Sequence, residues 1–122
     1  MQREELYLQD IIESISAIGS FLQNIEKDEF LTSDLLQSAV SHKLMIIGEA
    51  SARLTDELKS RYSNTPWKKI VGLRNITAHA YFTIDWEAIW STVTNHLQPL
   101  CEEVKEILKN EFPDFELRDE KK

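Results

Sequence analysis

The sequence predicts an all-α fold, an antiparallel up-and-down bundle of about four main helices. Its 122 residues correspond to one domain, and 42% of them are hydrophobic, which is enough to build a core. Only three glycines and three prolines occur, whereas an all-β fold needs many turns. Apolar residues recur at steps of three and four, as on one face of a helix. We expect a single helical domain at residues 1–110 and a charged tail at residues 111–122.

Two helices are expected in the first half of the chain. The first covers residues 4–26 and is followed by a loop at residues 27–31. Its apolar stripe consists of Leu8, Ile11, Ile15, Ile18, Leu22 and Ile25. The second begins near residues 32–34, whose hydroxyls and carboxylate can cap a helix, and continues unbroken to about Tyr62. Its stripe consists of Val40, Leu44, Ile47, Ala50, Leu54 and Leu58.

Two further helices are expected in the second half. The third opens at residues 65–67 with a capping hydroxyl and a proline at the first helical position, and it continues to about Ala78. Gly72 inside it is either a weak point or a place where another backbone comes close. The fourth covers residues 83–110, with a kink expected at Pro99. Its stripe follows a heptad seam: Trp86, Trp90, Val93, Leu97, Leu100, Val104 and Ile107.

The environment and assembly of the chain can also be predicted. Cys101 is the only cysteine, so no internal disulfide is expected, and its place on the apolar stripe predicts burial. Residues 1–5 lack the features of a signal peptide, and the longest apolar run, residues 44–47, is far too short to cross a membrane. We therefore expect a cytoplasmic protein with no membrane partner. The long amphipathic stripes favour a homodimer through a helix face.

Charge is distributed unevenly along the sequence. The net charge of −7 argues against general binding to nucleic acid, so no DNA partner is expected. Residues 58–84 contain five cations and no acid, which leaves −12 on the remainder. The five are Lys59, Arg61, Lys68, Lys69 and Arg74. This stretch is either a local anion site or a solvated face that happens to lack acids, and charge alone does not separate the two.

Several kinds of site are excluded by residue type and spacing. The three histidines, His42, His79 and His96, show no metal-ligand spacing, and no cysteine pair or Gly-rich phosphate loop occurs. We therefore expect no metal site and no cofactor. His42 and His96 join no second ionisable group at a spacing typical of a site, so both are expected to be bystanders.

Residues 74–81 are the remaining place where chemistry can occur. Arg74 can clamp a phosphate through two hydrogen bonds, and His79 can move a proton. Asn75 lies four residues before His79, so on a helix the two share a face and Asn75 can orient the imidazole. Tyr81 can donate a hydrogen bond or accept a modifying group. The alternative is structural, because the same residues can cap a helix end and complement its dipole.

Helical geometry restricts how Arg74 and His79 cooperate. They are five residues apart, which separates them by about 140° around a regular helix. They cannot both address one phosphate from an unbroken helix. Either the helix ends before His79, or the site combines residues from two chains.

Residues 74–81 resemble the Arg-x4-His-x-Tyr signature of the HepT-like branch of the HEPN superfamily. The flanks resemble the family as well: residues 46–50 its helix-two motif, residues 66–75 its run into the site, and residues 82–90 its exit. The resemblance covers roughly residues 4–110. It implies a helical homodimer in which the two Arg-His motifs line a shared cleft. It also implies a ribonuclease toxin with an MntA-like minimal nucleotidyltransferase antitoxin, which transfers AMP to Tyr81.

The resemblance leads to a specific hypothesis of metal-independent RNA cleavage. His79 would act as general base or acid for attack by the RNA 2′-hydroxyl, and Arg74 would stabilise the charge on the phosphoryl oxygens. The residues expected to support them or to contact RNA are Asn75, Tyr81, Lys68, Lys69 and Glu49. Glu49 either hydrogen-bonds Arg74 or packs as a buried structural acid. The rival hypothesis is a non-catalytic helical module whose cleft binds a nucleotide or a protein partner.

Overall fold

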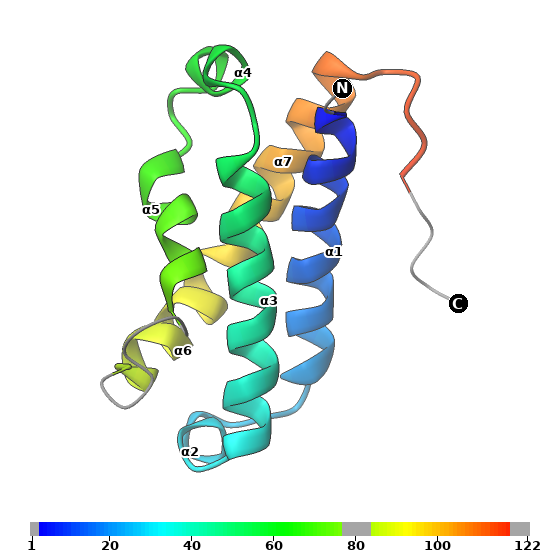
Figure 1. Cartoon of the computed structure of the whole chain (residues 1–122). Coiled ribbons are helices and arrows are strands. Elements are labelled where there is room, and N and C mark those ends of the chain that lie inside the picture. The colour runs from blue at the N-terminus through cyan, green and yellow to red at the C-terminus, as the bar shows by residue number, and fades with distance from the viewer. Residues whose placement is uncertain (1–2, 77–83, 118–122) are drawn as a thin grey trace.

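The structure, a computed structural model, describes residues 3–76 and 84–117, and within these ranges it contains helices and no strand (Figure 1). The helices are α1 (Glu4–Phe21), α2 (Lys27–Leu31), α3 (Asp34–Ala52), α4 (Asp56–Arg61), α5 (Trp67–Gly72), the 3-10 helix η1 (Leu73–Asn75), α6 (Trp86–Asn95) and α7 (Leu97–Glu111). The predicted all-α class is therefore confirmed. None of these helices is both long enough and apolar enough to span a membrane.

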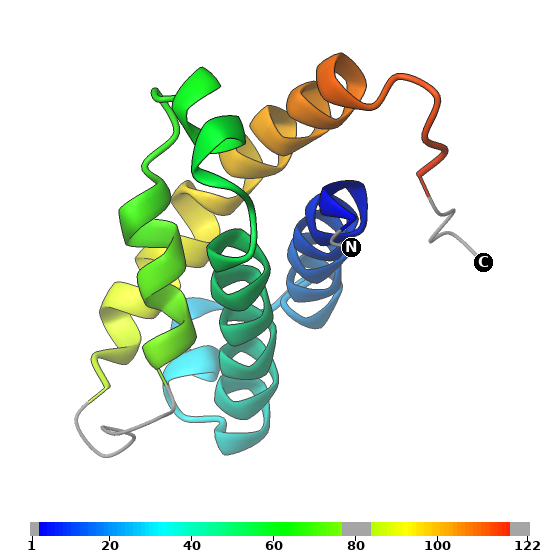
Figure 2. The ribbon, with the colours of Figure 1, turned by 45° about the horizontal axis from the view of Figure 1, so that its top comes forward.

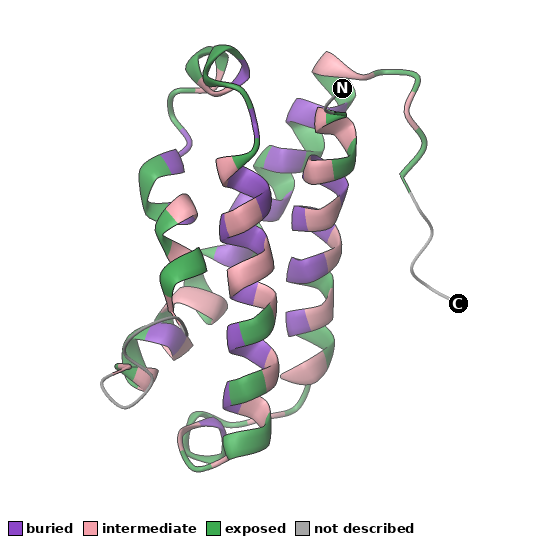
Figure 3. Ribbon diagram, in the orientation of Figure 1, coloured by how far each residue is buried: buried purple, intermediate pink, exposed green. Residues whose placement is uncertain are grey.

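Helix α3 lies at the centre of the bundle. It packs against α1 on one side and against α5 and η1 on the other, and α7 completes the core against α1 (Figures 1 and 2). The buried faces of α1 and α3 are turned inward, toward the other helices (Figure 3). Every residue of the stripe predicted for the second helix is buried, and Cys101 is buried as expected. Hydrophobic burial on these faces therefore determines the arrangement.

The expected second helix is interrupted. Helix α3 ends at Ala52, and α4 begins at Asp56 after a short turn. The Thr55 hydroxyl caps α4 by accepting a hydrogen bond from the Leu58 backbone N–H at 3.2 Å, and a Glu4 carboxylate oxygen accepts one from the Thr55 N–H at 2.8 Å. These partners satisfy backbone groups that the interruption exposes.

The expected fourth helix is also divided, but not by a kink at Pro99. Helix α6 ends at Asn95 and α7 begins at Leu97, with His96 between them. Pro99 lies in the first turn of α7, where a backbone N–H would have no acceptor within the helix, so the N–H that proline lacks is not missed there. A proline at this position would clash with the carbonyl of Asn95 in a continuous helix, which explains why the break comes before Pro99.

The segment expected as a loop at residues 27–31 forms the short helix α2. The fully buried Phe30 ring holds it in place, with its centroid 6.0 Å from that of Trp86 and 5.4 Å from that of Trp90. The Gln37 side-chain amide donates to the Phe30 carbonyl at 3.1 Å. Helix α1 correspondingly ends at Phe21, and Asn24 turns the chain with a φ of 63°.

The third helix positions the candidate site and is shorter than expected. Helix α5 ends at Gly72, not near Ala78, and tightens into η1. Its first residue, Trp67, is buried, and its indole N–H donates to the Tyr62 carbonyl at 3.1 Å. Arg74 and Asn75 are thereby presented on a 3-10 turn that packs against α3.

Candidate functional site

A glycine on α3 allows the turn that carries Arg74 to approach closely. A Cβ added at Gly48 would lie 3.0 Å from both Cα and Cβ of Arg74 and would approach the Arg74 backbone nitrogen more closely still. Such distances are not tolerated between real side chains and backbone, so only glycine fits here. The backbone of Arg74 is thus seated directly on α3. The close approach considered for Gly72 does not occur, since a Cβ there would meet nothing within 4 Å.

The Arg74 guanidinium forms part of a short chain of charges. Its Nη1 donates to Glu49 Oε1 at 3.5 Å, and Arg53 Nη2 lies 3.1 Å from Glu49 Oε2. The side chains of Arg74 and Glu49 are 43% and 46% exposed, so the carboxylate is not a buried structural acid. Of the two roles considered for Glu49, its place beside Arg74 favours the hydrogen bond. Arg53 was not anticipated from the sequence.

The basic stretch separates into two groups in space. Arg61 is bound by Glu111 through two hydrogen bonds, of 3.0 and 2.8 Å, and Lys59 donates to the Ser51 carbonyl at 3.3 Å. Glu111 raises the pKa of Arg61, and the Arg61 guanidinium in turn lowers the pKa of Glu111. These two cations therefore belong to the scaffold.

The second group faces solvent near the candidate site. Lys68, Lys69 and Asn75 are exposed, and within the described residues neither lysine is within ion-pair distance of an acid. Of the five cations in residues 58–84, these two lysines and Arg74 are therefore the ones that can attract an anion.

Two of the predicted site residues, His79 and Tyr81, lie outside the described residues. Residues 73–75 form a 3-10 turn, so Arg74 does not lie on a regular α-helix. The 140° separation, which requires a regular α-helix, therefore has no support from the described residues. His42 lies exposed on α3.

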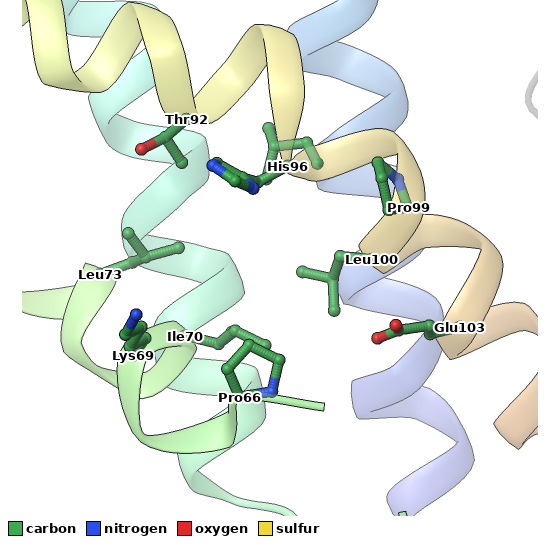
Figure 4. A pocket seen from close by; sticks show the side chains of 10 residues that line it. Pro66, Lys69, Ile70, Leu73, Thr92, His96, Pro99, Leu100 and Glu103 are labelled. Atoms are coloured by element: carbon green, nitrogen blue, oxygen red, sulfur yellow. The ribbon is translucent and has the colours of Figure 1, made fainter. Parts of the chain in front are cut away.

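A groove between α5 and the α6–α7 junction was not predicted. It has a volume of about 520 Å³, and Figure 4 shows side chains from both sides converging on it. Its lining consists of Pro66, Lys69, Ile70, Leu73, Thr92, His96, Leu97, Pro99, Leu100 and Glu103. Spacing along the chain gave His96 no ionisable partner, so it was expected to be a bystander. In three dimensions His96 shares this groove with Lys69 and Glu103.

Comparison with known proteins identifies the family. Residues 11–116 match the HepT-like family, described as "Ribonuclease HepT-like". The chain belongs to this family. The resemblance found in the sequence is therefore confirmed, and the enzyme class that it predicted, an endoribonuclease, agrees with the family description.

Individual relatives of this HepT-like protein come from archaea and bacteria. "Putative RNase MJ1380" of Methanocaldococcus jannaschii is 37% identical over 81% of this chain and 91% of its own length. "Probable ribonuclease HepT" of Thermococcus cleftensis is 36% identical over 77% of this chain and 86% of its own. "Putative RNase TTE0752" of Caldanaerobacter subterraneus subsp. tengcongensis is 32% identical over 91% and 99%. No solved structure matches the chain significantly.

Proposed function

We propose that this HepT-like protein is an endoribonuclease toxin that cleaves RNA without a metal ion. The observation that carries the proposal is the placement of Arg74, the arginine of the family motif. Its backbone is fixed against Gly48, while its guanidinium remains 43% exposed. A rigidly held cation open to solvent is suited to bind a phosphate group whose charge increases during reaction.

Arg74 has hydrogen-bonding capacity to spare for a substrate. A guanidinium carries five N–H donors, and the contact with Glu49 uses one of them at a long distance of 3.5 Å. The remaining donors can address two phosphoryl oxygens at once. We assign to Arg74 the stabilisation of the charge that develops on those oxygens, and to Glu49 the orientation of the guanidinium.

The remaining assignments follow the motif. His79 serves as the general base that takes the proton of the attacking 2′-hydroxyl, or as the general acid that protonates the 5′-oxygen as the bond between it and the phosphorus breaks. Asn75 orients the His79 imidazole. No metal is needed to generate a nucleophile, because the substrate itself supplies the hydroxyl. Lys68 and Lys69 attract the RNA backbone to a chain whose net charge is otherwise unfavourable.

A cleavage assay tests the proposal. Arg74→Ala and His79→Ala should each abolish cleavage of an RNA substrate. His42→Ala, which changes an exposed histidine on α3, is the matched control and should retain cleavage. The product should end in a 2′,3′-cyclic phosphate, and EDTA should leave the rate unchanged. Loss of activity in EDTA with recovery on adding a divalent ion would contradict the metal-independent mechanism. RNA binding by the wild type without cleavage would favour the non-catalytic alternative.

We further propose that a nucleotidyltransferase antitoxin silences the enzyme by transferring AMP to Tyr81. The modification would place bulk and negative charge two residues from His79 and repel the RNA phosphate. Mass spectrometry of the protein co-expressed with a neighbouring nucleotidyltransferase should show the added mass of AMP on the peptide that contains Tyr81. Tyr81→Phe protein should remain unmodified and toxic in the same cells.

A further inference from the structure

The groove between α5 and the α6–α7 junction combines apolar walls with a few polar groups. Ile70, Leu73 and Leu100 supply apolar surface, and Lys69, His96 and Glu103 supply the ionisable groups (Figure 4). Its volume of about 520 Å³ falls within the range of about 300–1,000 Å³ typical of small-molecule sites. These features distinguish it from an ordinary gap between helices.

The groove continues from the candidate catalytic turn. Leu73 lines it and immediately precedes Arg74, and Lys69 lies one helical turn earlier on α5. A ligand in the groove would therefore have the Lys69 cation at one wall, while the Arg74 guanidinium contacts Glu49 on α3 and is not part of the lining. Such an arrangement favours a ligand that carries phosphate.

The opposite wall offers a hydrogen-bond acceptor. Glu103 Oε1 accepts a hydrogen bond from the Thr65 hydroxyl at 3.1 Å, which fixes the carboxylate, and within the described residues no hydrogen bond is recorded to Oε2. A carboxylate repels phosphate, so its presence calls for a ligand with hydrogen-bond donors at the end opposite its phosphate. A nucleobase attached to a nucleotide provides this separation.

We propose that the groove binds a guanine nucleotide. Guanine is the base whose Watson–Crick edge presents two adjacent donors, N1–H and the 2-amino group, and these match the two oxygens of Glu103. The base lies between the apolar walls with the His96 ring available for stacking, and its phosphate lies near Lys69. Adenine, cytosine and uracil do not present two adjacent donors on this edge, so none of them can pair with both oxygens of Glu103. That the nucleotide belongs to an RNA strand rests on the proposed function.

An NMR titration of the full chain tests binding without any cleavage step. GMP should shift the amide signals of Leu73, His96 and Leu100 and should bind more tightly than AMP or CMP. Glu103→Gln keeps an acceptor for Thr65 but loses the carboxylate, and it should weaken GMP binding about tenfold without weakening AMP binding. Glu106→Gln, an exposed residue of α7 outside the groove, is the matched control and should bind GMP as the wild type does.

The phosphate and the source of the nucleotide are tested separately. Lys69→Gln should weaken binding of GMP but not of guanosine, with Lys105→Gln as the control. An all-2′-O-methyl RNA oligonucleotide with one guanine, which cannot be cleaved by 2′-hydroxyl attack, should bind more tightly than GMP if the strand is the ligand. Equal affinity would overturn the RNA source and leave a free-nucleotide site. Identical shifts with inorganic phosphate, or equal binding of GMP and AMP, would overturn the guanine site even if the chain cleaves RNA.

Discussion

Gly48 shows how the absence of a side chain can position a functional residue. It lies inside the C-terminal part of α3, where alanine would ordinarily be the better helix former. Its lack of a Cβ lets the backbone of Arg74 rest on the helix, which fixes the start of the guanidinium side chain. The orientation of Arg74 thus depends on backbone packing as much as on its contact with Glu49.

Replacing Gly48 should therefore damage both stability and activity. In Gly48→Ala the new methyl group meets the Arg74 backbone, which cannot move as a flexible side chain can, and we expect a loss of about 1–3 kcal/mol in the free energy of unfolding. RNA cleavage should fall further than the folded fraction accounts for. Urea denaturation and a cleavage assay on the same preparation measure the two effects.

Gly19→Ala provides the matched control. A Cβ at Gly19 on α1 meets nothing within 4 Å, so alanine should stabilise the helix by about 0.5–1 kcal/mol and leave cleavage unchanged. If both alanine variants had the same effect, the seating of Arg74 on α3 would not matter.

The sequence identified the candidate residues, but it did not predict all the contacts that hold them in place. Arg74 and Glu49 were identified and do lie together. Arg53 was missed because it is four residues from Glu49 on an exposed face, where such pairs are common. The close approach was considered for Gly72 and occurs at Gly48, because periodicity shows which residues face the interior but not where a neighbouring backbone comes nearest.

At the level of elements, the second and fourth helices expected from periodicity are interrupted without losing their apolar stripe. Leu54, in the turn between α3 and α4, and Leu58, in α4, remain in the core, and Leu97 remains in the core at the start of α7. The pattern therefore continues through each break. The α3–α4 turn depends on Glu4, about fifty residues away in sequence, and so could not be read from its local sequence.

Helices α4 and α7 are joined by a cluster of polar side chains. The Glu111 carboxylate accepts hydrogen bonds from Arg61 and, at 2.8 Å, from the Tyr62 hydroxyl. Arg61 and then Tyr62 lower the pKa of Glu111, while burial and then the hydrogen bond to Glu111 raise the pKa of Tyr62. The charged form of Glu111 is therefore favoured in the folded protein.

The folded protein should lose this contribution in acid. A carboxyl group whose pKa is lowered by folding stabilises the protein fully at pH above its ordinary value of 4.5, and its contribution disappears as the pH falls below that value. In Glu111→Gln, stability at neutral pH should be lower, and the decline between about pH 6 and pH 3 should be shallower than in the wild type. Thermal denaturation across this range measures both effects.

Glu106→Gln is the corresponding control, since Glu106 is exposed on the same helix and makes no recorded ion pair within the described residues. It should follow the wild-type pH profile. A profile for Glu111→Gln that parallels the wild type would show that the cluster holds α4 and α7 together without depending on charge.

Across the whole molecule, the candidate site is a small basic region on an acidic body. Arg61 and Lys59 are engaged by the scaffold, which leaves Lys68, Lys69 and Arg74 to attract an anion. One chain with a net charge of −7 offers few cations to an RNA strand. Two chains related by a two-fold axis near η1 would double them at one place.

We therefore expect a homodimer whose cleavage site combines Arg74 of one chain with His79 of the other. Mixing inactive Arg74→Ala and His79→Ala proteins tests this, because a mixed dimer then retains one intact pair. If subunits exchange at random, half of the dimers are mixed and each has one of its two sites, so about a quarter of wild-type cleavage should return. Sedimentation and an RNA cleavage assay follow assembly and activity together. Full wild-type activity at a solution mass of 14.2 kDa, or no recovery after demonstrated exchange, would contradict a shared site.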